Sequence, residues 1–478
     1  MSLTKNSIVT VDIIDLTFEG LGVAKHDGMA VFVHGALQGE KIKAKILSVK
    51  KRHAFARVEE ILVASVTRAK PACRYFPKCG GCSLQHMHYT AELEVKKTWI
   101  ARTLEKKGVV WDTPYLKSPF KIVASNLEYR CRNKCSLPIR EAKDGSVAVG
   151  FFRKKSHEVI DIDDCLLQMG NMRDLVFTLK AWLNGEVDGE KRTDKDDKTS
   201  RHKEVNVGRK ILAYNEEKHT GNVRHITLRM LDNRAVICLV GTQTPHAIDF
   251  KPFIERLGAL YPSGFMLYYN QNPVKTNVIY GDSYTLIAGD DTPFNVDGLQ
   301  LNVHPAGFFQ VNDYVRQKMF EVVKEWVEEI GAHTVIEAYA GQAVLAAKLS
   351  GLAKKVYAIE ICPQSIHAGN EMKQLNSIDN IEFIQGDCGI ELAKLLKRLA
   401  DEPLVILDPP RSGLCEKARS AVATARPTNI MYISCNPDSL ARDIASFGTG
   451  YATVHMRAFD MFPKTLNVET LVWLQKTD

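Results

Sequence analysis

The sequence predicts an α/β protein: a C-terminal doubly wound parallel sheet, preceded by a small β-barrel and a central strand-rich region. Three observations predict this. Short apolar strands alternate with helical segments from about residue 333, short strands broken by glycines fill residues 7–62, and a long strand-rich stretch lies between them. The alternation is typical of a parallel sheet, and the short strands are typical of a small barrel. We therefore expect three domains, at residues 1–65, 66–300 and 301–478.

Composition sets limits on the class of protein. The chain has 478 residues, no apolar run that approaches the ~20 residues of a membrane span, and no apolar signal core at its N-terminus. We expect a cytoplasmic monomer with no membrane or DNA partner. A net charge of +7 permits an anionic partner without requiring one. The odd count of eleven cysteines favours metal ligation, catalysis and burial over a disulfide frame.

The first domain has strand periodicity. Lysines alternate with apolar residues from Lys41 to Ile46, so the lysines should share the solvent face of one strand. The segments EGLG at 19–22 and VFVHGAL at 31–37 resemble the TRAM module of RNA-modifying enzymes, a barrel related to OB-folds. That resemblance implies a barrel that binds RNA.

The central region opens with a cysteine cluster, followed by a predicted helix near residues 90–107. Two glycines separate the last pair of its three cysteines, Cys73, Cys79 and Cys82. Glycine lets a backbone fold closely around a metal. As the fourth ligand we choose Cys165 over Cys131 and Cys135, which lie in a strand-like basic stretch. Four thiolates hold zinc or an iron–sulfur cluster, and the spacing alone slightly favours zinc.

Basic and aromatic residues interleave around this cluster, an arrangement that suits phosphates and unstacked bases. The basic residues are Arg130, Arg132, Lys134, Arg153, Lys154 and Lys155, and the aromatic ones are Tyr75, Phe76, Tyr129, Phe151 and Phe152. The alternative is an ordinary solvated sheet face with core aromatics. Residues 184–204 are almost wholly polar and should form a surface loop.

A nucleotide-type site is predicted where the strands of the C-terminal sheet end. The first strand ends in Glu337 to Gly341, the second in Glu360, and the third runs into Asp387. An acid at the tip of the second strand is typical of a ribose-binding position. Singly, each acid also fits a helix cap or a surface position. The glycine loop continues as Gln342-Ala343, and alanine can replace glycine there if φ stays negative, although binding could be weaker.

The fourth and fifth strands deliver reactive groups. The fourth ends in Asp408-Pro409-Pro410-Arg411, and the fifth ends in Ser434-Cys435-Asn436-Pro437. The pattern after the fourth strand does not tell whether a nitrogen or a carbon atom of the substrate is methylated. A cysteine before a helix N-terminus can have a depressed pKa. Carbon 5 of uracil needs a thiolate added at carbon 6 before it accepts a methyl group, and a base must then remove its proton. Glu469 is the candidate base.

The closing segments DPPRSGL, YISCNPDSLARD and DMFPKTLNVET resemble the RNA 5-methyluridine methyltransferases, and the likeness covers essentially the whole chain. The resemblance implies S-adenosylmethionine as cofactor, Cys435 as nucleophile and Glu469 as base. It implies cofactor contacts from Gln310, Tyr339, Gly341, Glu360, Asp387 and Asp408. The residues expected to contact substrate are Phe308, Gln310, Asp408, Arg411, Arg132 and Lys134.

The ribosomal members of that family carry a [4Fe–4S] cluster on a matching cysteine pattern, which implies such a cluster here instead of zinc. Together with the barrel, this favours 23S ribosomal RNA over transfer RNA as substrate. Two departures bear on cofactor affinity: Asn467 stands where the family has histidine, and Gly341-Gln342-Ala343 replaces its glycine loop. The rival interpretations are a non-catalytic RNA-binding relative and an amino-group methyltransferase.

Overall fold

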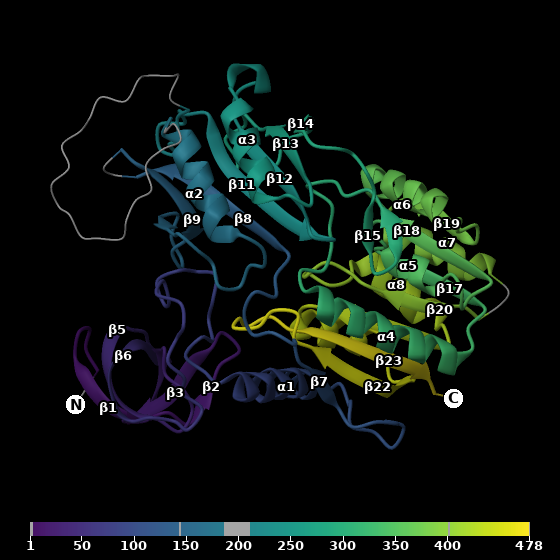
Figure 1. Ribbon diagram of the computed structural model, residues 1–478. Coiled ribbons are helices and arrows are strands. Elements are labelled where there is room, and N and C mark those ends of the chain that lie inside the picture. The colour runs from purple at the N-terminus through teal and green to yellow at the C-terminus, as the bar shows by residue number, and fades with distance from the viewer. Residues whose placement is uncertain (1–2, 143–144, 186–210, 400–401, 478) are drawn as a thin grey trace.

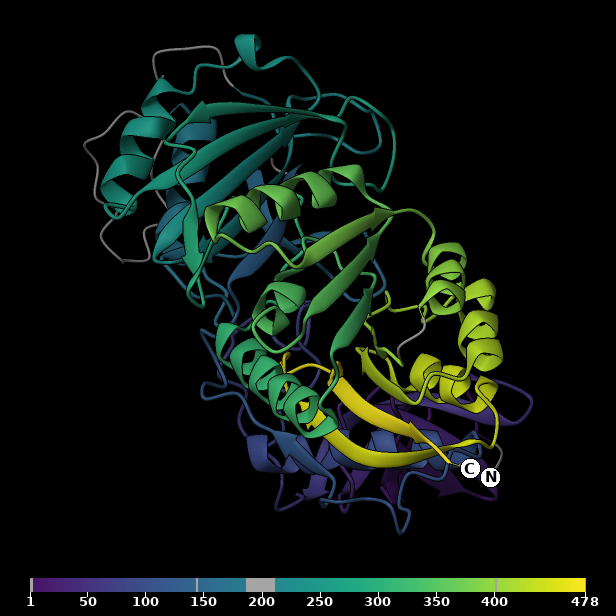
Figure 2. The ribbon, with the colours of Figure 1, turned by 90° about the vertical axis from the view of Figure 1, so that its right-hand side faces the viewer.

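Three parts follow one another along the chain in the computed structural model, which describes residues 3–142, 145–185, 211–399 and 402–477. A six-stranded sheet curls into a barrel, a seven-stranded sheet forms the centre, and an eight-stranded sheet carries helices on both faces (Figures 1 and 2). The predicted fold class is confirmed. Residues 186–204 of the predicted polar loop lie outside the described residues. No helix in the described ranges has the length and apolar character needed to cross a membrane.

The N-terminal barrel has the strand order β1-β5-β6-β4-β3-β2. Its strands are β1 (Ile8–Asp12), β2 (Asp15–Leu16), β3 (Leu21–His26), β4 (Met29–His34), β5 (Lys41–Val49) and β6 (His53–Val63). Ile42, Ala44 and Ile46 fill the barrel, whereas Lys41 and Lys43 are exposed. The period-two pattern of β5 therefore has the predicted orientation.

The central sheet has the order β10-β9-β8-β11-β12-β13-β14, and α2 and α3 supply apolar side chains to its core. The strands are β8 (Lys134–Glu141), β9 (Val147–Phe152), β10 (Val159–Asp161), β11 (Val223–Leu231), β12 (Arg234–Gly241), β13 (Phe265–Gln271) and β14 (Ser283–Ala288). The helices are α2 (Met172–Leu183) and α3 (Lys251–Leu260), with a short 3-10 turn at Pro245–Ala247. A hairpin of β15 (Phe294–Val296) and β16 (Leu299–Leu301) leads to the last part.

The C-terminal sheet has the order β19-β18-β17-β20-β21-β23-β22-β7. Its parallel strands are β17 (Thr334–Ala338), β18 (Lys355–Glu360), β19 (Ile381–Gln385), β20 (Leu404–Leu407) and β21 (Asn429–Ser434). The antiparallel pair β22 (Tyr451–Phe459) and β23 (Glu469–Lys476) follows, and β7 (Lys121–Val123) closes the edge. The carboxyl ends of the five parallel strands therefore meet along one edge of the sheet.

Two apolar clusters cover the two faces of this sheet. One face packs against α4 (Asp313–Ile330), α5 (Val344–Leu349) and α6 (Pro363–Leu375). The other packs against α7 (Cys388–Arg398), α8 (Glu416–Ala425) and α9 (Pro437–Ser446). Ile100 and Leu104 of α1 (Tyr89–Lys106) join the second cluster. The helix that follows the cysteine cluster in sequence thus packs on the C-terminal sheet, as Figure 1 shows.

A buried ion cluster ties α1 to residues 460–468, which join β22 to β23 and which we call the closing loop. The Lys96 ammonium donates hydrogen bonds to Glu92 and Asp460, each at 2.7 Å, and to the Phe462 carbonyl at 3.2 Å. The side chains of Lys96, Glu92 and Asp460 are fully buried. The Glu92 carboxylate also accepts from the Lys464 amide at 2.7 Å. These contacts fix where the closing loop starts relative to α1.

Replacing Lys96 by methionine should destabilise the fold by about 3–5 kcal/mol, because two buried carboxylates lose their cation. Urea unfolding followed by circular dichroism measures this loss. Lys97→Met is the matched control: Lys97 lies on the same helix but is partly exposed, so a change within about 0.5 kcal/mol is expected. Equal unfolding midpoints for Lys96→Met and the parent would contradict the assigned role.

Candidate active site

A pocket of about 340 Å³ lies where β17, β18 and β19 end. Three predicted residues line it: Tyr339, Glu360 and Asp387. The lining also includes residues that the sequence analysis had not assigned to the cofactor, namely Ile361, Cys388, Pro410, Ser412, Gly413, Leu414 and Cys415. Cys388 directly follows Asp387 after the third strand, so its position was readable from the sequence. Cys415 carried no comparable signal.

Backbone amides hold the Glu360 carboxylate in place. It accepts hydrogen bonds from Gly341 at 2.8 Å, Ile361 at 2.9 Å and Cys362 at 2.8 Å. The Gly341 bond links the glycine turn after β17 to the acid at the end of β18. This arrangement leaves Glu360 fixed at the pocket wall, as a diol-binding acid requires.

Two features of the pocket fit a bound nucleoside. The Tyr339 hydroxyl is buried and has no hydrogen-bond partner within the described structure, so a ligand can supply one. The side chain of Ile361 is 64% exposed although it is apolar, which suits contact with a flat base. Asp387 has a structural role as well, because its carboxylate caps α7 by accepting from the Ile390 amide at 3.2 Å.

The altered glycine loop adopts a conformation that the sequence analysis did not anticipate. Ala343 has φ of 58°, in the left-handed region, so the condition set for alanine at this position, a negative φ, is not met. The turn is kept although alanine is strained there. Glu337, by contrast, is structural, since its carboxylate accepts from the Ala346 amide at 2.8 Å at the start of α5. Burial raises the pKa of Glu337 to about 8.

A second group of residues gathers where β20, β21 and β23 meet. The register of β21 and β23 pairs Ser434 with Thr470, and this places Cys435 beside Glu469. Asp408 follows β20, the other neighbour of β21. Burial raises the pKa of Asp408 to about 7, and burial together with Asp408 raises that of Glu469 to about 8. One thiol and two carboxyl groups therefore share a desolvated site.

The pKa of Cys435 shifts in the direction opposite to our prediction. Burial and the Glu469 carboxylate raise it to about 11, and the charge of Arg411 opposes the shift. We had expected the N-terminus of α9 to depress it. Desolvation and two nearby acids disfavour the thiolate more than the helix end favours it. In the ligand-free protein Cys435 is therefore a neutral thiol at neutral pH.

The remaining predicted residues are not among those that line the 340 Å³ pocket, and they differ in their surroundings. Gln310 is buried, and its backbone carbonyl oxygen accepts a hydrogen bond from the side-chain amide of Asn133 at 3.1 Å. Phe308 is 72% exposed and free to contact a ligand. The Arg411 guanidinium donates to the Asn467 side chain at 3.2 Å, so Asn467 positions an arginine at the site entrance. Lys134 is half-buried, and desolvation lowers its pKa to about 8.

The four predicted metal ligands line one small pocket: Cys73, Cys79, Cys82 and Cys165. Arg132 lines the same pocket, and two of its buried guanidinium nitrogens have no partner in the described residues. Cys131 and Cys135 are not among the lining residues. Within the described ranges, however, no three histidine, cysteine or acidic side chains come close enough to hold a metal ion. The structure thus brings the ligands together without arranging them around one ion.

Arg132, which we expected at the substrate, also touches the closing loop. Its guanidinium lies 5.7 Å from the centre of the Phe462 ring. The closing loop thus runs from Phe462, beside Arg132 of the cysteine pocket, to Glu469, the first residue of β23.

Comparisons with known proteins define the class. Residues 294–477 match the tRNA (uracil-5-)methyltransferase family and residues 3–58 match the TRAM domain. Proteins named as uncharacterized RNA methyltransferases are 33% identical in Halalkalibacterium halodurans and in Clostridium acetobutylicum, each over 99% of this chain and 98% of theirs. The chain belongs to this family of uracil-5 RNA methyltransferases, which use S-adenosylmethionine.

A solved structure agrees over nearly the whole length. The Pyrococcus abyssi tRNA (uracil-54, C5)-methyltransferase, in complex with S-adenosyl-L-homocysteine, is 25% identical with a TM-score of 0.71. The likeness covers 97% of this chain and 99% of that one. The barrel, central sheet and C-terminal sheet therefore form one shared architecture.

Alkylation should test the state of Cys435. Iodoacetamide should label it slowly at neutral pH and faster as the pH rises towards about 11, because only the thiolate reacts. Glu469→Gln should increase the rate at a fixed alkaline pH, since the carboxylate that raises the pKa is gone. Mass spectrometry of the Cys435 peptide measures the rate, and Glu325→Gln on the exposed face of α4 is the control. A rate that already levels off near neutral pH would refute the raised pKa.

Proposed function

We propose that this protein methylates carbon 5 of uridine in 23S ribosomal RNA, with Cys435 as the nucleophile and Glu469 as the general base. The observation that carries the proposal is the register of β21 and β23, which sets the Cys435 thiol beside the buried Glu469 carboxyl group. An amino-group methyltransferase needs no nucleophilic thiol there.

The proposed reaction has three steps. The Cys435 thiol loses its proton to solvent and its sulfur bonds to carbon 6 of uracil, while the electron pair of the bond between carbons 5 and 6 moves onto the ring and makes carbon 5 nucleophilic. Carbon 5 then takes the methyl group that S-adenosylmethionine would supply, and S-adenosylhomocysteine would be the leaving group. Glu469 removes the hydrogen from carbon 5, and the returning electron pair breaks the bond between sulfur and carbon 6. Asp408 lies near both groups, where it can accept a hydrogen bond from the uracil.

The residues of the cofactor pocket fit S-adenosylmethionine: Glu360 suits the ribose, Tyr339 offers an unpartnered hydroxyl and Ile361 suits the adenine. When bound, the cofactor supplies an electrophilic methyl group and a positive charge. A cation near Cys435 and Glu469 lowers the pKa of both groups. The thiol and the base of the ligand-free protein, both protonated at neutral pH, would thereby be activated only when the site is loaded.

Transfer RNA is the second candidate substrate, because the structure similar over the whole length is that of a tRNA (uracil-54, C5)-methyltransferase. The presence of the barrel does not favour ribosomal RNA over transfer RNA, because the similarity to the tRNA methyltransferase covers 97% of this chain and so includes the barrel. The cysteine pattern remains the reason for placing ribosomal RNA first.

We also propose a [4Fe–4S] cluster held by Cys73, Cys79, Cys82 and Cys165. A cluster with four thiolates is an anion, and the unpartnered guanidinium nitrogens of Arg132 in the same pocket fit an anion. Burial raises the pKa of Cys165 to about 12, so this thiol binds only if the metal displaces its proton. The side chains must also move together, because they do not surround a common point as they stand.

Glu469→Gln should trap a covalent protein–RNA species that already carries the methyl group, because the base acts after methyl transfer. Its turnover should fall by about 10²–10⁴-fold, whereas Cys435→Ala should give neither adduct nor methyl transfer. The measurement is a denaturing gel with methyl-labelled cofactor, run with 23S ribosomal RNA and with transfer RNA.

Glu325→Gln, which removes an exposed carboxylate on α4, should behave as the parent. Undiminished methylation by Cys435→Ala would favour amino-group transfer, and no methylation by the parent of either RNA would favour a non-catalytic RNA-binding protein. Label on transfer RNA alone would make transfer RNA, and not 23S ribosomal RNA, the substrate.

Anaerobically purified protein should be brown and hold about four irons per chain. Cys165→Ser should lose the colour and the iron, while Cys238→Ser, at a buried cysteine of β12 outside the pocket, should keep both. Iron analysis and visible absorption measure this. Stoichiometric zinc without iron would overturn the cluster and leave the methyltransferase proposal unaffected.

A further inference from the structure

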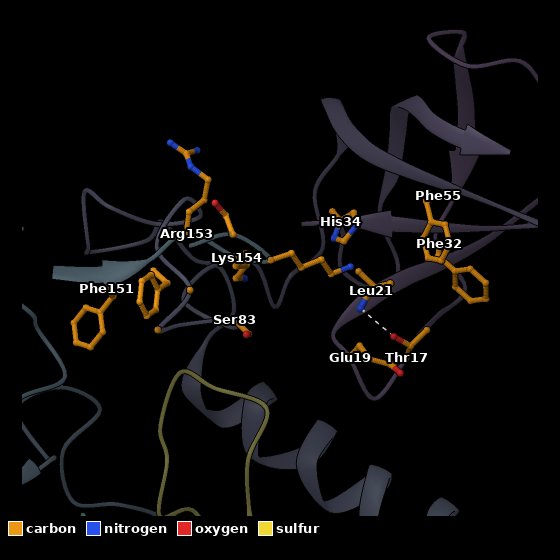
Figure 3. A pocket seen from close by; sticks show the side chains of 15 residues that line it. Thr17, Glu19, Leu21, Phe32, His34, Phe55, Ser83, Phe151, Arg153 and Lys154 are labelled. Atoms are coloured by element: carbon orange, nitrogen blue, oxygen red, sulfur yellow. Dashed lines mark hydrogen bonds between the residues drawn. The ribbon is translucent and has the colours of Figure 1, made fainter. Parts of the chain in front are cut away.

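One wall of the cofactor pocket is irregular chain. Residues 410–415, which we call the wall segment, lie between β20 and α8 without forming a helix or strand, and all of them except Arg411 line the pocket. The cleft in Figure 3 is a separate one, between the barrel and the turn after β9, and no residue of the wall segment lines it. Whatever places the wall segment therefore also shapes the cofactor pocket.

A buried carboxylate on α9 holds the wall segment. Asp443 is fully buried, and its Oδ2 atom accepts hydrogen bonds from the Leu414 amide at 2.7 Å and the Tyr432 hydroxyl at 2.6 Å. Its Oδ1 atom accepts from the Arg442 guanidinium at 2.8 Å, and the Arg419 guanidinium lies 3.5 Å away. A buried carboxylate is stable only with such partners. Asp443 therefore joins β21, α8 and the wall segment to α9.

The two arginines bind the wall segment as well as the carboxylate. Arg442 donates to the Ser412 carbonyl at 2.9 Å, and Arg419 donates to the Leu414 carbonyl at 2.7 Å. Each guanidinium thus bridges Asp443 and a backbone oxygen, which its planar set of donors allows. We call Asp443, Arg442 and Arg419 the clamp, because together they bind the wall segment through both its amide and its carbonyl groups.

The clamp and the wall segment fit closely at Gly413. This residue has φ of 77°, in the left-handed region, and a Cβ added to it would come within 2.5 Å of both the Asp443 carboxylate and the Arg442 guanidinium. The third neighbour of that Cβ is Ser439, which also belongs to α9. The added atom would therefore meet α9, so the clamp itself accounts for the need for glycine.

The helix that carries the clamp carboxylate also follows the nucleophile directly. Cys435 precedes Asn436, the N-cap residue of α9. The Asn436 side chain donates to the Arg411 carbonyl at 3.1 Å, and the Ser439 hydroxyl donates to the same carbonyl at 3.3 Å. The wall segment is thus bound to α9 next to Cys435 and again at Asp443, about two turns further along.

We propose that Asp443 is a positioning residue that holds the wall segment on α9, so that the cofactor pocket and Cys435 keep a fixed relation to each other. The inference deepens the proposed function, since Cys435 is its nucleophile. Asp443 does not line the pocket and acts through Leu414 and the clamp arginines. Methyl transfer requires carbon 5 of the uracil bound to Cys435 to meet the cofactor, and a small displacement of either lowers the rate strongly.

Asp443→Asn should weaken binding of S-adenosylhomocysteine to the full-length protein on the order of tenfold, because the wall segment and the two arginines lose a charged acceptor. Isothermal titration calorimetry without RNA measures this affinity. Asp438→Asn is the matched control: it changes an exposed acid on the same helix and should leave the affinity unchanged.

Tyr432→Phe separates positioning from stability. It removes a hydrogen bond from Asp443 but no contact to the wall segment, so it should lower the Tm while the affinity for S-adenosylhomocysteine stays close to that of the parent. Arg442→Gln changes a partly exposed side chain and should weaken binding in the same direction as Asp443→Asn, which keeps the proposal testable if Asp443→Asn does not fold.

Gly413→Ala displaces the wall segment from its other side, so it should also weaken binding. Combined with Asp443→Asn it should cause no greater loss than the worse single variant, because both break the same contact. In turnover with S-adenosylmethionine and RNA, Asp443→Asn should raise the KM for the cofactor and lower kcat, with the KM for RNA unchanged.

Three results would overturn the proposal: parental affinity in folded Asp443→Asn or Arg442→Gln, an equal loss in Tyr432→Phe, or additive losses in the double variant. Failure of the proposed function is distinguishable from these. The parent would then methylate no uridine, whereas the effect on S-adenosylhomocysteine binding, measured without RNA, would persist.

Discussion

The closing loop leads into β23, whose first residue is Glu469, the proposed general base, and a buried cation fixes the path of that loop. Lys96 is bound by Glu92 and Asp460 in the interior, where unpaired charges cost several kcal/mol. Lys464 extends the cluster by pairing with Glu128 at 2.8 Å. The loop thereby contacts α1, the cysteine region through Ser83, and Arg132 through Phe462. The ion cluster thus joins α1 to a loop more than 350 residues further along the chain.

Desolvation governs the chemistry of the same region. Asp408, Glu469 and Cys435 all have raised pKa values, of about 7, 8 and 11, because burial disfavours their charged forms. A thiol that stays protonated without ligand does not react with stray electrophiles. In the mechanism proposed above, Cys435 and Glu469 are activated when a cation and a substrate arrive.

Much of the fold and site was predictable from local sequence. Alternating strands and helices give the parallel sheet, and the strand ends at Glu360, Asp387 and Asp408 follow from it. Long-range effects were not predictable. Glu92 and Lys96 have the spacing of an ordinary surface pair on a helix, and only the approach of Asp460, far along the chain, buries them. The raised pKa of Cys435 likewise results from burial and from Glu469 on another strand, whereas the expectation of a lowered pKa used only the helix that follows Cys435 directly in sequence.

The central claim is that Cys435 bonds to a uracil of the RNA. The most direct measurement is to incubate the protein with S-adenosylmethionine and RNA containing 5-fluorouridine, then to identify the linked peptide by mass spectrometry. Fluorine cannot be removed as a proton, so the adduct should persist, and the account predicts that the nucleotide is attached to Cys435. Attachment to another residue, or methylation of ordinary uridine with no adduct on the fluorinated RNA, would contradict it.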